Sequence, residues 1–125
     1  MSLDVYLTGE TTEVQCVCSD CGHMHRKQIS TRFFHSNITH NLSEMAHEAR
    51  IYYELWHPDQ IGITKAKDLI KPLTEGLTLM YLNPERFKKH NAHNGWGLYE
   101  NFVPWIQSYL TACQTWPEAD VHTSC

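Results

Sequence analysis

The chain has 125 residues, a length that suits one domain, and its 42% apolar and 19% charged residues are ordinary values for a folded protein. The formal net charge of −4 argues against a general nucleic-acid binder, because such proteins carry a basic stripe. No apolar run approaches the ~20 residues of a membrane span, and the first residues lack the basic and apolar segments of a signal peptide. We therefore expect a cytoplasmic protein without membrane association.

The first third of the chain is predicted to be β-structure. Alternating apolar residues predict strands over residues 3–7 and 14–18, with a turn over residues 8–12 between them. A third extended stretch is expected over residues 25–34, because threonine and phenylalanine favour strands.

Three later segments carry apolar residues at helical spacing. They predict helices over residues 42–56, 66–81 and 99–113, with bends at the prolines inside the second and third. Residues 121–123 are expected to form a short edge strand that closes onto the N-terminal sheet. The order of elements predicts an α+β fold in which a small antiparallel sheet with a zinc-knuckle hairpin packs against three helices.

This prediction treats the chain as a single domain with three parts. Residues 1–36 are expected to be mainly β-structure with the metal hairpin, and residues 37–117 to hold the three helices. Residues 118–125 are expected to form a short strand or tail.

The densest chemical cluster lies in residues 16–25. Cys18 and Cys21 form a Cys-x-x-Cys-Gly turn, which suits two of the four thiolate or imidazole ligands of a tetrahedral zinc ion. If the chain makes a hairpin through residues 19–22, period-two geometry places further ligand candidates on one face. In that register Cys16 lies opposite His25, and Cys18 lies opposite His23.

These residues predict a structural zinc ion. The expected ligands are Cys16, Cys18, Cys21 and His23, with His25 in reserve and His40 able to reach in from elsewhere. A site closed by four protein ligands supports the fold and does no chemistry. The alternatives are a reduced hairpin with ordinary thiols and, less favoured because Cys16 and Cys18 are too close along one strand to bridge easily, a disulfide.

Two polar segments each lead into a predicted helix. The first is residues 35–41 and the second is residues 90–100. Helix N-termini offer free N–H groups to an anion, and tryptophan and tyrosine can stack a flat ligand. The ligand-binding candidates are Asn37, His40, Asn41, Asn94, Trp96 and Tyr99.

Three other interpretations of these segments stay open. The asparagines can be helix caps and turn formers, with Trp96 as a core plug between two glycines. The aromatic residues can instead anchor a protein partner. In the enzymatic alternative, His40 acts as general acid or base on a nucleotide-like substrate, assisted by His93 or Glu100.

Several motifs resemble a family of small uncharacterised proteins encoded by bacteriophages and by prophages in bacterial genomes. The resemblance is carried by Asn-Ile-Thr-His-Asn-Leu at residues 37–42 and by Asn-Gly-Trp-Gly-x-Tyr-Glu at residues 94–100, and it extends over residues 35–121 and the first seven residues. This chain differs in the cysteine hairpin and at His57, where the family carries arginine before the proline. The resemblance implies a bacterial host cell but no activity.

Together these observations predict a phage-encoded accessory binding protein with a structural zinc site. Its partner is expected to be a host protein, such as a defence component that it blocks, or a small anionic ligand. The runner-up is the small enzyme built around His40, and a virion structural or assembly protein is a third possibility. The sequence makes no prediction of the oligomeric state.

Overall fold

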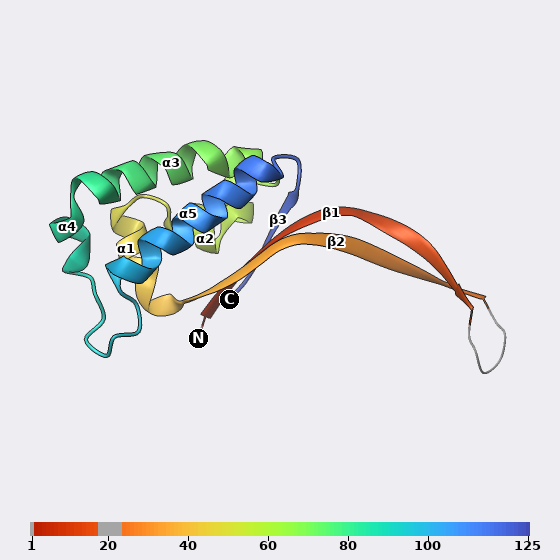
Figure 1. The fold of residues 1–125 in the computed structure, drawn as a ribbon, viewed down its shortest axis with the longest axis horizontal. Helices are drawn as coiled ribbons and strands as arrows, with labels where there is room; N and C mark the ends of the chain where they lie inside the picture. Colours follow the sequence, from red (N-terminus) through yellow and green to blue (C-terminus); the bar gives the residue numbers. More distant parts are fainter. Residues whose placement is uncertain (1, 18–23) are drawn as a thin grey trace.

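The computed structural model describes the backbone of residues 2–17 and 24–125, and the side chains of residues 2–9 and 31–125. In these residues a small antiparallel sheet packs against several helices, so the predicted α+β class is confirmed (Figure 1). The zinc-knuckle part of that prediction lies mainly at residues 18–23, outside the described residues. No helix in the described ranges is long and apolar enough to cross a membrane.

The sheet has three strands in the order β2-β1-β3. Strand β1 (Ser2–Val17) pairs antiparallel with β2 (Met24–Thr39) and with β3 (Asp120–Ser124). The expected C-terminal edge strand is therefore confirmed. Since β3 pairs only as far as Thr8, the outer halves of β1 and β2 extend beyond it as a two-stranded ribbon, pointing away from the helices in Figure 1.

The predicted turn over residues 8–12 is wrong, because β1 runs through it as one strand. The pairing register shifts between Leu7 and Thr8, and again between Thr8 and Thr11. Such β-bulges absorb unmatched residues without ending the strand. Gly9 suits this place, since a Cβ there would lie 3.0 Å from the ring of Phe33.

Strand β2 is longer than predicted and includes residues 35–39, which we expected to lie in a polar loop. Ile38 is buried and pairs with Leu3, whereas the neighbouring Asn37 is exposed. The segment therefore has the alternation of a half-buried strand, which its histidine and asparagine residues conceal. This extension carries Asn37 to the point where the first helical turn begins.

The predicted helix over residues 42–56 is broken into shorter pieces. These are the 3₁₀ turn η1 (His40–Leu42), α1 (Ser43–Glu48) and α2 (Tyr52–Trp56). Arg50 has a left-handed φ of 63° between α1 and α2, a conformation that ends a helix.

The break places Ile51 against the helix α3 (Lys67–Leu82), at Gly76. A Cβ on Gly76 would lie 2.8 Å from Cγ2 of Ile51, so the glycine allows the close approach. The sequence could not show this contact, because it joins residues 25 positions apart.

The remaining helices follow the prediction closely. After the short turn η2 (Pro58–Ile61), α3 (Lys67–Leu82) continues through Pro72, and α5 (Tyr99–Thr115) continues through Pro104. A short helix α4 (Pro84–Lys88) lies between them, outside the three predicted helices. The loop from α4 to α5 then returns to η1, as Figure 1 shows at the end of the molecule opposite the ribbon.

The core lies between the inner half of the sheet and the helices. Apolar side chains of β1, α3 and α5 belong to one buried cluster, and the largest fully buried side chains are Trp56, Tyr109, Phe87 and Phe102. Burying each such aromatic side chain contributes about 2–3 kcal/mol to stability. This packing fixes the end of β2 and η1 in place, and those elements carry the site described next.

Candidate functional site

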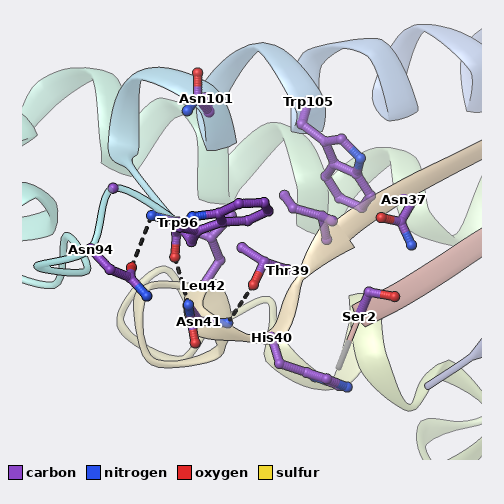
Figure 2. Close-up of a pocket in the computed structure, with 13 residues that line it drawn as sticks. Ser2, Asn37, Thr39, His40, Asn41, Leu42, Asn94, Trp96, Asn101 and Trp105 are labelled. Atoms are coloured by element: carbon purple, nitrogen blue, oxygen red, sulfur yellow. Dashed lines mark hydrogen bonds between the residues drawn. The ribbon is translucent and has the colours of Figure 1, made fainter.

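A pocket of about 800 Å³ opens where the end of β2, η1 and the loop before α5 meet (Figure 2). Its floor is apolar, from Ile38 and Leu42, and its walls carry amide and aromatic groups. The thirteen lining residues are Ser2, Asn37, Ile38, Thr39, His40, Asn41, Leu42, Asn94, Gly95, Trp96, Gly97, Asn101 and Trp105. We call it the Asn–Trp pocket.

The pocket brings together residues from two distant parts of the sequence. Five of the six predicted ligand-binding residues line it: Asn37, His40, Asn41, Asn94 and Trp96. They come from segments more than 50 residues apart in the chain, so only the tertiary fold places them side by side.

Tyr99, the sixth predicted residue, lies outside the lining. Its hydroxyl donates to the backbone oxygen of Met80 at 2.9 Å, and its backbone N–H donates to Oδ1 of Asn91 at 2.8 Å. Burial raises the pKa of the Tyr99 hydroxyl. Tyr99 therefore fixes the start of α5 against α3 and does not face a ligand.

Trp96 is displayed at the rim of the pocket with 70% of its surface exposed. The interpretation of this residue as a core plug is therefore wrong. Its backbone is nevertheless held on both sides: its N–H donates to Oδ1 of Asn94 at 3.0 Å, and its oxygen accepts from Nδ2 of Asn41 at 2.7 Å (Figure 2). The ring is thus accessible on a fixed backbone.

The glycines on both sides of Trp96 shape this loop. Gly95 and Gly97 have φ values of 78° and 119°, which residues with a Cβ rarely adopt. A Cβ on Gly97 would also lie 2.9 Å from Cβ of Asn41, so the glycine lets the loop approach η1. The Asn-Gly-Trp-Gly motif is therefore explained by loop geometry around an exposed indole.

His40 is held by a buried tryptophan, and no sequence pattern predicts this contact. The indole Nε1–H of Trp56, which is 1% exposed, donates to Nδ1 of His40 at 2.8 Å. Since an indole N–H can only donate, Nδ1 must carry the lone pair, and the neutral imidazole then carries its proton on Nε2. His40 therefore presents a donor, and its one basic nitrogen is already occupied.

None of the thirteen lining residues is Asp, Glu, Lys or Arg. The groups available to a ligand are amides, hydroxyls, the Nε2–H of His40 and the indoles of Trp96 and Trp105. This arrangement can bind a polar, planar and uncharged group, but among the residues that line it there is no full charge to hold an anion.

A second, smaller pocket of about 420 Å³ adjoins the first, and His40 and Asn41 line both. Charged and titratable residues contribute here: Glu44, Lys89, His90 and His93. Of the residues proposed for catalysis, His93 and His40 share this second pocket, whereas Glu100 lines neither pocket. The structure therefore separates Glu100 from the other two.

The predicted zinc ligands are only partly described. Cys18, Cys21 and His23 lie outside the described residues, but the backbone pairing of Cys16 with His25 agrees with the predicted hairpin register. Among the residues that the structure does describe, no group of three or more His, Cys, Asp or Glu side chains could hold a metal ion. Away from the hairpin, Cys113 is buried in the core, which raises the pKa of its thiol to about 12.

Four polar or aromatic lining residues were not predicted: Ser2, Thr39, Asn101 and Trp105. Asn101 and Trp105 are four positions apart on α5, so they share one helix face. Their spacing in the sequence could therefore have predicted that they lie together. Ser2 and Thr39 are direct partners across β1 and β2, which only the register reveals.

No family model, curated protein or solved structure matches this sequence. The resemblance to phage and prophage proteins therefore stays a prediction, and the function has to be argued from the pocket.

Proposed function

We propose that this chain is a phage-encoded accessory protein that binds a small planar ligand in the Asn–Trp pocket and so withdraws it from a process of the bacterial host. The observation that carries the proposal is Trp96, an exposed indole whose backbone is fixed from both sides by asparagine side chains. An exposed aromatic ring on a rigid support provides a stacking surface at little entropic cost.

The size and chemistry of the pocket support a small molecule as the occupant. Its volume of about 800 Å³ falls within the range of ligand sites in proteins. Its amide groups can both donate and accept hydrogen bonds, which suits the edge of a heterocycle. A host protein inserting a side chain is the alternative occupant, and the experiment below separates the two.

Binding is favoured over catalysis by the state of His40. A general base needs a free lone pair within reach of the substrate, but Nδ1 of His40 already accepts from Trp56 at 2.8 Å. Of the thirteen lining residues, none is a carboxylate that could replace it. The same geometry leaves the proton of the neutral imidazole on Nε2.

Mass spectrometry of protein purified gently from host cells tests this function. We expect a small molecule to be retained by the wild-type chain and by Tyr53→Ala, and to be lost from Trp96→Ala. Tyr53 is the matched control, because it is also an exposed aromatic residue but lines neither described pocket. Retention by Trp96→Ala would contradict the proposal, and so would a co-purifying host protein without any small molecule.

We propose separately that the outer end of the β1–β2 ribbon carries a structural zinc ion. The sequence of the cysteine cluster and the direct pairing of Cys16 with His25 support it. We expect about one equivalent of zinc per chain by elemental analysis, lost in Cys18→Ser and Cys21→Ser and kept in Cys125→Ser, whose cysteine is exposed and distant in sequence. Less than about half an equivalent in the wild type would count against the site.

A further inference from the structure

The Asn–Trp pocket and the second pocket form one continuous surface with two chemistries. His40 and Asn41 line both, and the loop that follows α4 contributes Lys89 to one and Trp96 to the other. The hydrogen bond from Nδ2 of Asn41 to the oxygen of Trp96 lies at this boundary. A ligand that reaches across Asn41 would therefore touch an uncharged aromatic wall at one end and a charged wall at the other.

The charged wall carries both signs of charge, since Lys89 and Glu44 both line it. Glu44 is directed to His90, with its Oε2 3.8 Å from Nδ1 of the imidazole. Nearby Glu48 is paired with Arg86, whose hydrogen bond lowers the pKa of the Glu48 carboxyl. Lys89, which also acts electrostatically on Glu48, is the one lysine or arginine among the residues that line this pocket, and His93 lines it as well. An anion in this pocket would therefore meet Lys89 and His93.

We propose that the two pockets together bind one nucleotide, with its base on Trp96 and its phosphate against Lys89 and His93. This inference rests on the proposed function, because it names the ligand class of the same site. Aromatic rings stack on nucleobases of any sequence, and asparagine amides pair with base edges. The phosphate needs a cationic group, which the Asn–Trp pocket lacks and the second pocket supplies.

Titration calorimetry with adenosine, adenosine monophosphate and inorganic phosphate tests the proposal, with the other three nucleoside monophosphates as a base panel. We expect at least one monophosphate to bind at least about tenfold more tightly than its nucleoside, the fold-change that one charge-assisted hydrogen bond contributes. That difference should shrink as salt is added, because the phosphate contact is partly exposed. Inorganic phosphate alone should bind more weakly than the nucleotide, since it lacks the stacking surface.

Lys89→Gln is the decisive variant. It should reduce nucleotide affinity about tenfold to the nucleoside level and leave nucleoside affinity unchanged, because the base contacts lie in the other pocket. Lys71→Gln is the control, since Lys71 is an exposed lysine of α3 that lines neither pocket. An unchanged nucleotide affinity in Lys89→Gln would overturn the proposal.

The outcomes separate this inference from the function on which it rests. If nucleoside and nucleotide bind equally, or if neither binds, the nucleotide assignment is wrong, while loss of the retained ligand in Trp96→Ala would still support a binding pocket. If Trp96→Ala keeps its retained ligand, the proposed function fails first. Inorganic phosphate binding as tightly as every nucleotide would also overturn the proposal, because Trp96 would then contribute nothing.

Discussion

The two walls of the Asn–Trp pocket are held in place by different forces. The strand-side wall, residues 37–42, is part of a paired strand and a 3₁₀ turn whose Ile38 and Leu42 are buried in the core. The loop-side wall, residues 94–97, buries no large apolar side chain. It is held by a hydrogen bond that Asn41 donates to the Trp96 oxygen, by one that Asn94 accepts from the Trp96 N–H, and by two left-handed glycines. One wall depends on apolar burial, and the other on polar contacts and backbone conformation.

Because of this difference, we expect the two walls to contribute differently to stability and to ligand binding. Apolar burial couples the strand-side wall to global stability, so truncating its buried residues Ile38 or Leu42 should strongly destabilise the protein. Hydrogen bonds at a surface loop contribute little to global stability but fix a local geometry. We therefore expect substitutions in the loop-side wall to cost less stability than loss of a buried apolar side chain in the strand-side wall, and to act mainly on ligand binding where they displace Trp96.

The largest effect is expected at Leu42 in the strand-side wall. Leu42→Ala should lower the free energy of unfolding by about 2–5 kcal/mol, because Leu42 is 1% exposed and its loss leaves a cavity. Trp96→Ala should change it by no more than about 0.5 kcal/mol, since the ring is exposed. Urea denaturation followed by circular dichroism measures both, and similar costs for the two variants would refute the contrast.

Gly97 should be the most sensitive residue of the loop-side wall. Gly97→Ala combines a φ of 119° with a Cβ placed 2.9 Å from that of Asn41, so we expect a cost of about 1–3 kcal/mol and displacement of Trp96. Gly95→Ala is the matched control: its φ is 78°, but its Cβ would meet nothing within 4 Å. It should cost about 1 kcal/mol and leave ligand affinity largely intact. Equal losses of affinity in the two variants would show that close approach to Asn41 is unimportant.

Asn41→Ala should release the loop-side wall from the strand-side wall at a moderate cost in stability. It removes the 2.7 Å hydrogen bond to the Trp96 oxygen, for which we expect a loss of about 1 kcal/mol. Hydrogen exchange should accelerate in the 92–97 loop and stay unchanged in β2. Asn101→Ala, another lining asparagine, serves as the control. Faster exchange in both segments would mean that the walls are not independent.

The smallest effect is expected from pH, through Asp4 of β1. Oδ1 of Asp4 lies 3.0 Å from Nε2 of His35 and 3.0 Å from Nδ2 of Asn37, and hydrogen bonds from His35 first and Asn37 second lower the pKa of its carboxyl below the ordinary 3.8. A lowered pKa in the folded state gives stability that is complete above the unfolded value and disappears as pH falls through the folded one.

We therefore expect Asp4→Asn to destabilise the protein at about pH 6, and we expect that difference to shrink at about pH 2, below the ordinary 3.8 of the carboxyl. Urea midpoints of both proteins at the two pH values measure it. A difference that persists at the lower pH would assign the effect to packing and not to the ionised carboxylate.

The sequence alone determined the features that depend on local periodicity. The alternation at Leu3, Val5 and Leu7 predicted the inner part of β1, and apolar stripes predicted α3 and α5 across their internal prolines. The backbone pairing of Cys16 with His25 followed from the hairpin geometry of the predicted cluster. The residue types of the two polar segments also indicated where a site would form.

The tertiary structure decided what depends on contacts between distant residues. Arg50 ends a helix that we predicted to continue to residue 56, and Ile51 then packs against Gly76. The donor state of His40 depends on the indole of Trp56, and the backbone of Trp96 is held by the amide of Asn41. Local sequence patterns indicate which residues face a core. They do not indicate which partner a polar group contacts, because that partner comes close only when the whole chain folds.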